Sequence, residues 1–464
     1  MPSQRTSSTI EVLLDLDRAS KSTLHHQLEQ QLRDAVRTGR FGAGMTLPST
    51  RALAAQLGVT RGVVVEAYEQ LASEGYLVTR PGGSTRVAEG IVEPARTANP
   101  DAPAGYRYDF RPGRPDLAEF PRQSWMRSLR RALAAAPAER LGYLEGHGVP
   151  ELRQALSSYL DRVRGTSTDP GDIVVTSGFV QGLQLLARVT ARIGVQRVAV
   201  EDPWHADYRR VLRSAGMDVV PVAVDGEGMD VAALDASGAG VVILTPAHQY
   251  PTGAVLSGTR RAALLEWAAR NEALIVEDDY DAEYRYDREP IGSLQGLDPD
   301  RVVYAGTTSK TLAPGLRLGW LAVPPRLSER LARAKLAADY GSGALDQLAL
   351  ADYLEHGELD RHLRRMRLVY RGRRDALLGS LMRHLPELKP EGASAGLHVL
   401  VRLPAGLDAG KLVRHAAGLG IGLSDARETY AGEAPGPGLV FGYATMSERF
   451  IDQGIVALAS LLDR

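Results

Sequence analysis

Hydrophobic positions in the first ninety residues follow the period of a helix. Within residues 21–38 the apolar side chains stand three or four apart, which predicts an amphipathic helix. Two shorter helices are expected over residues 50–57 and 61–74. Gly58 and Gly75 would end them, because glycine accepts the left-handed backbone of a helix C-terminus. A helix, a short glycine turn and a second helix together form the helix-turn-helix pattern.

A hairpin is predicted after the helices. Residues 76–79 and 85–87 flank a turn rich in glycine and proline and predict its two strands. In a helix-turn-helix the second helix enters the major groove with its N-terminal residues at the base edges, here Thr60 and Arg61. The basic side chains that would lie on one side are Arg51, Arg61, Arg80 and Arg86. The alternative is a small helical module that binds protein and carries solvated arginines.

Residues 22–88 resemble the GntR-type winged helix-turn-helix. The motifs that carry the resemblance are LPSTRALA at 47–54, LGVTR at 57–61, AYEQL at 67–71 and EGYL at 74–77. The resemblance implies that this region binds double-stranded DNA. The residues implied are Ser49 and Arg51 at phosphates, Thr60 and Arg61 in the groove, and Gly83 in the wing. Gly62 departs from the family, which often has a polar side chain there. We expect the DNA-binding domain to span residues 10–88.

Residues 89–107 carry three prolines and no periodicity, so they predict a semi-stiff linker. Beyond it, apolar runs of strand length alternate with helical patterns. This alternation predicts an α/β domain with a mostly parallel sheet over residues 108–464. The clearest expected strands are residues 173–176, 198–200, 241–244, 273–276 and 302–304. Functional side chains should gather where these strands end.

One such end carries a lysine among small hydroxyl residues. Lys310 follows the apolar run at 301–305, where a lysine shielded from water can add to an aldehyde as a Schiff base. Thr307 and Ser309 offer hydroxyl donors for a phosphate, and Arg317 offers a planar cation. These residues indicate a site for pyridoxal phosphate (PLP). The alternative is a surface lysine in a polar loop.

Further strand ends carry matching groups. One strand is joined to the next helix by Ser177, Gly178 and Phe179, and the free amides of that helix start could hold a phosphate. The alternative is an ordinary glycine turn. His205 follows another strand, where its ring could stack on a flat ligand or simply pack. Asp278 lies in an acidic run after an apolar strand and could pair with a protonated pyridine. A capped helix start or a metal site are the alternatives for this run.

Taken together and in order, these strand ends resemble fold-type-I PLP proteins, the architecture of aspartate aminotransferase. The resemblance implies a Schiff base at Lys310 and contacts from Asp278 to the pyridine nitrogen and from Tyr280 to the ring hydroxyl. It implies phosphate contacts from Ser177, Gly178, Phe179, Thr307, Ser309 and Arg317. It also implies ring stacking by His205. Either Gln249 or Tyr250 stands where aminotransferases carry an asparagine.

A GntR-type module fused to this fold resembles the MocR group of bacterial regulators. The stretches that carry this resemblance are FRPGRPD at 110–116, EDDYD at 277–281 and GTTSK at 306–310. Tyr143 matches the tyrosine that reaches the phosphate of a partner subunit, which implies a homodimer.

The composition of the chain excludes several kinds of chemistry and partner. The net charge of −1 supplies no global field for nucleic acid or membrane, so DNA contacts must come from a local patch. The chain has no cysteine, which excludes disulfides and thiol chemistry. No signal peptide or uncharged run of membrane-spanning length is visible, so we expect a cytoplasmic protein without a membrane partner. Its 10 histidines lack a metal-ligand spacing, so we expect no metal site.

The late strand at 438–444 bears on the ligand. Aminotransferases grip the substrate carboxylate with an arginine there, because a guanidinium matches a carboxylate in two hydrogen bonds. Val440 occupies that position, and Arg427 is either a substitute or a loop charge. We therefore expect a regulator that senses PLP itself, as PdxR-type regulators of PLP synthesis do, and not an enzyme. The alternatives are a regulator that senses an amino acid and an aminotransferase with an appended DNA-binding module.

Overall fold

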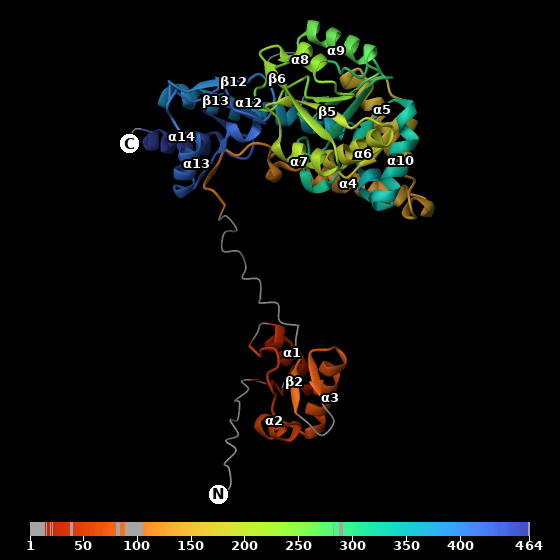
Figure 1. The fold of residues 1–464 in the computed structure, drawn as a ribbon, viewed down its shortest axis with the longest axis vertical. Coiled ribbons are helices and arrows are strands. Elements are labelled where there is room, and N and C mark those ends of the chain that lie inside the picture. Colours follow the sequence, from red (N-terminus) through yellow and green to blue (C-terminus); the bar gives the residue numbers. More distant parts are fainter. Residues whose placement is uncertain are drawn as a thin grey trace. The chain divides into compact units, whose positions relative to one another are not determined.

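The computed structural model describes residues 14, 16–18, 20, 22–37, 40–79, 84–88, 105–281, 283–286 and 291–462. The chain divides into two compact units, Met1–Ala104 and Gly105–Arg464 (Figure 1). Arg80 and Gly83, two of the predicted DNA-binding residues, lie outside the described residues, as do residues 89–104 of the predicted linker.

The N-terminal unit contains three helices and a hairpin. They are α1 (Leu24–Arg37), α2 (Thr50–Leu57), α3 (Arg61–Ser73), β1 (Leu77–Thr79) and β2 (Thr85–Val87). The strands pair antiparallel with Leu77 opposite Val87, and both of these side chains are buried. They pack with Leu28, Leu53 and Val64, one from each helix, into a single core. The helical periodicity therefore predicted the three helices to within a few residues, and the glycine- and proline-rich turn predicted the hairpin.

The second unit is built on an eight-stranded sheet. Its strands, in spatial order, are β4 (Ile173–Thr176), β11 (Gly319–Ala322), β10 (Val302–Thr307), β9 (Leu274–Asp279), β8 (Val241–Leu244), β5 (Arg197–Asp202), β6 (Asp218–Asp225) and β7 (Gly228–Met229). The neighbours from β10 to β6 pair in parallel, whereas β11 is antiparallel to both of its neighbours and β7 is antiparallel to β6. The fold is α/β with a large, mostly parallel sheet.

Alternate residues of the central strands face opposite layers of helices. Val198 and Val200 of β5 pack into a core with α6 (Phe179–Arg192), α7 (Ala206–Ser214) and α10 (Pro325–Asp339). Ala199, between them, packs with α8 (Val231–Ala236) and α9 (Gly258–Arg270) on the other face (Figure 1). Strands buried on both faces are continuously apolar, which is why their sequence signal was strong.

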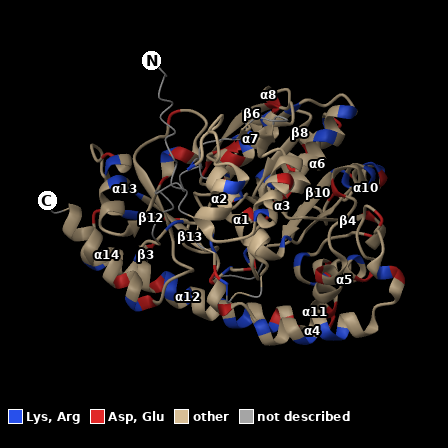
Figure 2. Cartoon of the chain, turned by 90° about the horizontal axis from the view of Figure 1, so that it is seen from below, with Lys and Arg blue, Asp and Glu red and all other residues tan. Residues whose placement is uncertain are grey.

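The remaining elements of the second unit form another apolar core, in addition to those on the two faces of the large sheet, and a smaller sheet. The long helices are α4 (Arg122–Ala135), α5 (Pro150–Arg164), α11 (Ala344–Glu355), α12 (Glu358–His384), α13 (Ala409–Gly418) and α14 (Glu448–Leu462). The small sheet has the order β12 (Lys389–Glu391), β13 (His398–Arg402), β16 (Gly438–Gly442) and β15 (Ser424–Asp425). A separate pair consists of β3 (Tyr108–Asp109) and β14 (Ile421–Gly422). Several arginines recur along each of the helices α4 and α12 (Figure 2).

Five short 3₁₀ helices complete the described elements: η1 (Leu117–Glu119), η2 (Ala138–Leu141), η3 (Pro170–Asp172), η4 (Pro314–Leu316) and η5 (Ala426–Thr429). Among the described residues, no helix combines the length and the apolar character needed to cross a bilayer.

Candidate cofactor site and DNA-binding surface

Lys310 follows the carboxyl end of β10. Its Nζ donates a hydrogen bond to the carbonyl oxygen of Gly113 at 2.6 Å. Burial lowers the pKa of Lys310, and the carboxylates of Asp281 and Asp278 oppose part of that shift. A lowered pKa increases the uncharged fraction of the amine, which is the form that attacks an aldehyde. The side chain is half-buried, unlike the surface lysine of the alternative interpretation.

Asp278 lies in β9, the neighbour of β10, and faces the same pocket as Lys310. Burial raises the pKa of this carboxyl well above its usual range, and the nearby acids Asp279 and Asp281 raise it further. Within the described part of the chain, its carboxylate makes no hydrogen bond or ion pair. A buried acid without a partner is costly, and a cation beside it would recover that cost.

Four of the six residues predicted to hold a phosphate lie at the ends of β4 and β10, and Arg317 lies just before β11. Arg317 donates a hydrogen bond to the carbonyl oxygen of Ser177. Gly178 has φ +87°, and a Cβ there would meet the Arg317 guanidinium at 3.0 Å, so only glycine permits this approach. The Thr307 hydroxyl donates to Ser309 Oγ at 2.9 Å. The sixth, Phe179, begins α6, whose first turn offers free amides.

Ser177 also belongs to a closed ring of hydrogen bonds. Its amide donates to Gln181 Oε1 at 2.8 Å, and Gln181 Nε2 donates to Asp339 at 2.7 Å. Lys335 donates to Asp339 at 2.6 Å and to Ser342 Oγ at 2.9 Å. Ser342 Oγ lies 3.1 Å from Ser177 Oγ, which completes the ring. The position of Ser177 is thus fixed by α6 and by the end of α10.

Aromatic rings form another wall of the pocket. The rings of His205 and Tyr250 are stacked, with centroids 4.5 Å apart and an interplanar angle of 12°. Burial lowers the pKa of His205 to about 4, so its imidazole is neutral at physiological pH. Gln249 does not line the pocket, because its amide donates to the carbonyls of Pro203 and Tyr250, each at 2.7 Å. The structure thus places Tyr250 at the pocket, where the sequence left two residues open.

Two predicted tyrosines have different surroundings. Tyr280 lines the pocket and donates its hydroxyl to the carbonyl oxygen of His248 at 3.1 Å. Tyr143 lies on the surface, 93% exposed, with its ring centroid 6.2 Å from that of Tyr340. Tyr340 is itself 72% exposed. The role predicted for Tyr143 requires a second subunit and stays a prediction.

The free space of the pocket, including solvent at its opening, is about 490 Å³. Five of the predicted residues line it, namely His205, Tyr250, Asp278, Tyr280 and Lys310. The residues that the sequence analysis did not single out are Gly113, Trp204, Tyr208, Thr245, Asp281, Leu397 and His398. Thr245 directly follows β8 and Trp204 lies two residues beyond β5, so the rule that ligands bind at strand ends could have found both. Leu397 and His398 lie at the start of β13 in the smaller sheet.

These residues fit PLP. The buried amine of Lys310 suits the aldehyde, and the unpartnered Asp278 carboxylate suits a protonated ring nitrogen. Arg317 and the hydroxyls at the ends of β4 and β10 supply donors for a phosphate. The chain therefore has a group that matches each functional part of the cofactor, although the phosphate donors are not among the residues that line the pocket.

The N-terminal unit carries the predicted DNA-binding residues at its helix starts. Ser49 caps α2 by accepting from the Ala52 amide at 3.2 Å. Thr60 begins α3, and its side chain makes no capping bond to the described helix. Arg61 is exposed, and its Nε lies 3.4 Å from Thr50 Oγ1. Arg51 is also exposed. The starts of α2 and α3 thus present basic and hydroxyl groups to solvent.

Two further contacts shape this surface. The Tyr68 hydroxyl of α3 donates to the Pro48 carbonyl at 3.0 Å, which ties the start of α2 to α3. Arg86 of β2 is exposed, with its Nε 3.5 Å from Ser84 Oγ, and forms an antiparallel bridge with Thr46. Exposed arginines at a helix start and on the wing are suited to phosphates and base edges.

Comparison with known proteins covers both units. Residues 24–87 match "Bacterial regulatory proteins, gntR family", and residues 113–417 match "Aminotransferase class I and II". The probable rhizopine catabolism regulatory protein MocR of Rhizobium meliloti is 33% identical over 97% of this chain and 95% of that protein. The chain belongs to the MocR-type transcriptional regulators.

Two further similarities support this membership. The HTH-type pyridoxine biosynthesis transcriptional regulator PdxR of Corynebacterium glutamicum is 34% identical over 91% of this chain and 92% of that protein. The multiple substrate aminotransferase of Thermococcus profundus has a TM-score of 0.72 at 26% identity, over 78% of this chain and 92% of that one. The second unit of this MocR-type regulator thus has the fold of the fold-type-I aminotransferases.

The late strand of this MocR-type chain lacks the arginine that is expected there in an aminotransferase. Val440 of β16 is fully buried and packs against Leu400 and Ala426, near Tyr250. Arg427 is not a substitute clamp, because it donates to Asp425 at 2.7 Å and to Asp408 at 3.2 Å. Of the described residues that line the pocket, none is an arginine.

Proposed function

We propose that this protein is a DNA-binding transcription regulator that binds PLP, responds to PLP itself and controls genes of PLP synthesis. The observation that carries the proposal is a pocket with a shielded lysine and an unpartnered acid but no lining arginine among the described residues. Similarity to a regulator named for pyridoxine biosynthesis supports the choice of ligand and target.

Each part of the pocket has a distinct task in this proposal. When bound, PLP supplies an aldehyde and an electron-withdrawing ring. Lys310 provides the amine that holds the aldehyde, and Asp278 stabilises the charged ring nitrogen. Ser177, Thr307, Ser309 and Arg317 bind the phosphate, and His205 covers a face of the ring. No arginine among the described lining residues then remains to orient an amino-acid carboxylate, which removes much of the advantage a transaminase needs.

The proposed regulator works as a homodimer with domains at residues 10–88 and 108–464 and a linker at 89–107. PLP can change DNA affinity only if it binds one arrangement of the effector domains more tightly than another. The linker passes that bias to the two DNA-binding domains, whose exposed arginines contact phosphates and bases.

The test is a titration of DNA affinity by fluorescence anisotropy at fixed salt. PLP-free protein is mixed with labelled promoter DNA, and PLP is added alone and then together with a panel of amino acids. A change with PLP alone supports the proposal. A change that needs an amino acid in addition identifies an amino-acid sensor, and steady turnover of an amino acid with a keto acid identifies an aminotransferase.

A further inference from the structure

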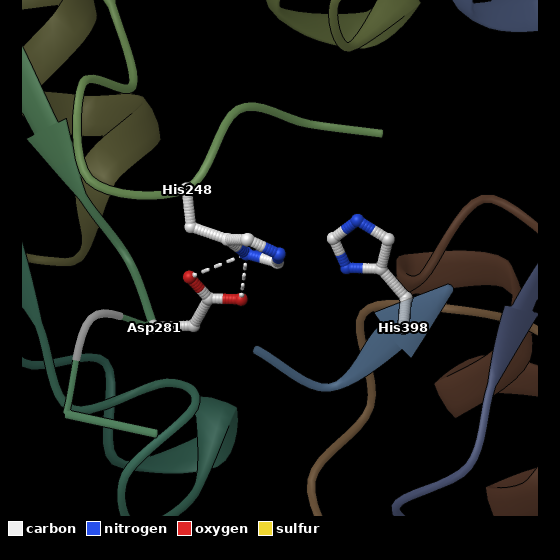
Figure 3. Close-up of side chains that lie close together, drawn as sticks. All are labelled: His248, Asp281 and His398. Atoms are coloured by element: carbon white, nitrogen blue, oxygen red, sulfur yellow. Dashed lines mark hydrogen bonds and ion pairs between the residues drawn. The ribbon is translucent and has the colours of Figure 1, made fainter. Parts of the chain in front are cut away.

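Three buried side chains from distant parts of the chain meet beside the pocket. They are His248, which follows β8, Asp281, which follows β9, and His398 of β13 (Figure 3). The exposed fraction of each residue is at most 3%. Their candidate ligand atoms all lie within 4.8 Å of one another. Imidazole and carboxylate are donors that Zn²⁺ and similar ions prefer.

One pair in this cluster has nearly the donor spacing of a coordination sphere. His248 Nδ1 lies 3.2 and 3.1 Å from the two carboxylate oxygens of Asp281. Zinc bonds of about 2.0–2.2 Å at a tetrahedral angle place neighbouring donor atoms roughly 3.3–3.5 Å apart. The ring of His398 lies across a gap from this pair (Figure 3), and its ligand atom is within 4.8 Å of theirs. His398 would therefore have to move closer to bring three donors around one ion.

The His248 ring lies among three polar groups. Its Nδ1 is 3.1 Å from Asp281 Oδ2 and 3.3 Å from the Tyr280 hydroxyl, and its Nε2 is 3.5 Å from the carbonyl oxygen of Gly392. A metal ion bound between Nδ1 and the Asp281 carboxylate would take the place of a proton shared by these two groups.

His398 supplies a donor that the protein leaves unused. Its Nε2 is buried and has no hydrogen-bond partner in the described structure. A buried polar atom without a partner is unusual in a folded protein and calls for an explanation.

We propose that His248, Asp281 and His398 bind one divalent transition-metal ion of the Zn²⁺ type. Three protein ligands leave an open coordination position, as in zinc sites that bind water or substrate. Asp281 and His398 line the pocket, so the open position is accessible to an oxygen atom of a molecule held there. The spacing of these residues along the chain, 33 and 117 positions, is why the histidine pattern predicted no metal site.

Metal binding is tested on the tag-free, full-length protein after removal of metal by chelation, without PLP or DNA. Zn²⁺ is titrated against a chromophoric chelator, and Co²⁺ is added separately to record its ligand-field spectrum. The expected result is one tightly held ion per chain. His398→Gln and Asp281→Asn should each weaken Zn²⁺ binding by at least about tenfold and alter the Co²⁺ band.

The matched control is His356→Ala. His356 forms an exposed pair with Asp352, with a nitrogen-to-oxygen distance of 3.3 Å, and should contribute nothing to the site. Thermal unfolding confirms that each variant is folded, and His398→Gln removes a neutral ring without a charged partner. The inference is overturned if the wild type holds no stoichiometric Zn²⁺, or if both cluster variants bind it as tightly as the wild type. Neither outcome bears on the proposed response to PLP.

Discussion

Lys310 Nζ and the carbonyl oxygen of Gly113 are 2.6 Å apart, although 197 residues separate them in the chain. This bond holds the amine beside the carboxyl end of β10, where it is partly shielded from water. Lys310→Ala should therefore abolish covalent uptake of PLP while leaving DNA binding by the PLP-free protein unchanged. Borohydride reduction followed by intact-mass measurement reports the first, and anisotropy reports the second. Lys411→Ala, on the surface of α13, is the control and should retain the reducible adduct.

Asp278→Asn should separate stability from ligand binding. Burial raises the pKa of this carboxyl, so its replacement by a neutral amide should increase the free energy of unfolding of the ligand-free protein, and the gain should grow as pH rises. The same change removes the countercharge for a ring nitrogen and should weaken PLP binding. Thermal unfolding without ligand and a PLP titration give the two quantities. A variant that loses stability without PLP would contradict this account of Asp278.

Arg61→Ala should weaken specific DNA binding. The side chain is exposed at the start of α3, and loss of a base-reading arginine costs about 1–3 kcal/mol, roughly a ten- to hundredfold change in affinity. Anisotropy at fixed salt on the operator and on an unrelated duplex separates the specific from the general loss. Arg414→Ala, an exposed arginine of α13, should leave both affinities as they are. Equal losses on both duplexes would assign Arg61 to the phosphates.

Glu201 should make stability depend on pH. Burial raises its pKa to about 7 from an ordinary value of 4.5, against the lowering effect of the hydrogen bonds from Thr245. Between these two values the folded chain holds a proton that the unfolded chain releases, so the contribution to stability falls as pH rises and is constant above about 7. The loss approaches about 3 kcal/mol across this window.

Glu201→Gln tests this dependence because the amide has the same shape and does not titrate. The difference in unfolding free energy between wild type and variant should change in favour of the variant from about pH 5 to about pH 8. Thermal or denaturant unfolding at each pH measures it. A difference that is independent of pH would place the Glu201 pKa outside this window.

Gly396→Ala should be strongly destabilising. Gly396 has φ +75°, and a Cβ there would meet His248 Cε1 at 2.2 Å and Asp281 Oδ2 at 2.4 Å. Strain and overpacking each cost about 1–3 kcal/mol. Gly406→Ala is the matched control, because its φ is +96° but nothing lies within 4 Å of the added atom. Unfolding free energies of the two variants should therefore differ, and similar values would show that the cluster adapts.

The sequence predicted the two-unit architecture and the sheet because buried parallel strands are continuous apolar runs. The bounds expected for β4 and β8 match the structure. The strand expected at 273–276 extends to Asp279, so the acids predicted to follow it lie within it. Strand β6 was missed because it is partly exposed and forms no continuous apolar run. The direction of β11 was not predictable because an apolar run carries no orientation.

Site residues beside a strand end were predictable, and those brought in by tertiary packing were not. Lys310 and Asp278 follow or end strands of the large sheet, where the rule for α/β folds places ligands. His398 comes from the smaller sheet, and nothing in its local sequence marks it as a neighbour of His248. The choice between Gln249 and Tyr250 depended on a side-chain orientation that only the folded loop determines.

The burial of Val440 restricts what can replace it. An arginine introduced there would bring its charge into the apolar cluster of Tyr250, Leu400 and Ala426. A carboxylate-binding arginine at this position would therefore lower stability unless its neighbours changed with it. Packing around one valine thus means that several coordinated substitutions are needed before this strand can hold a buried cation.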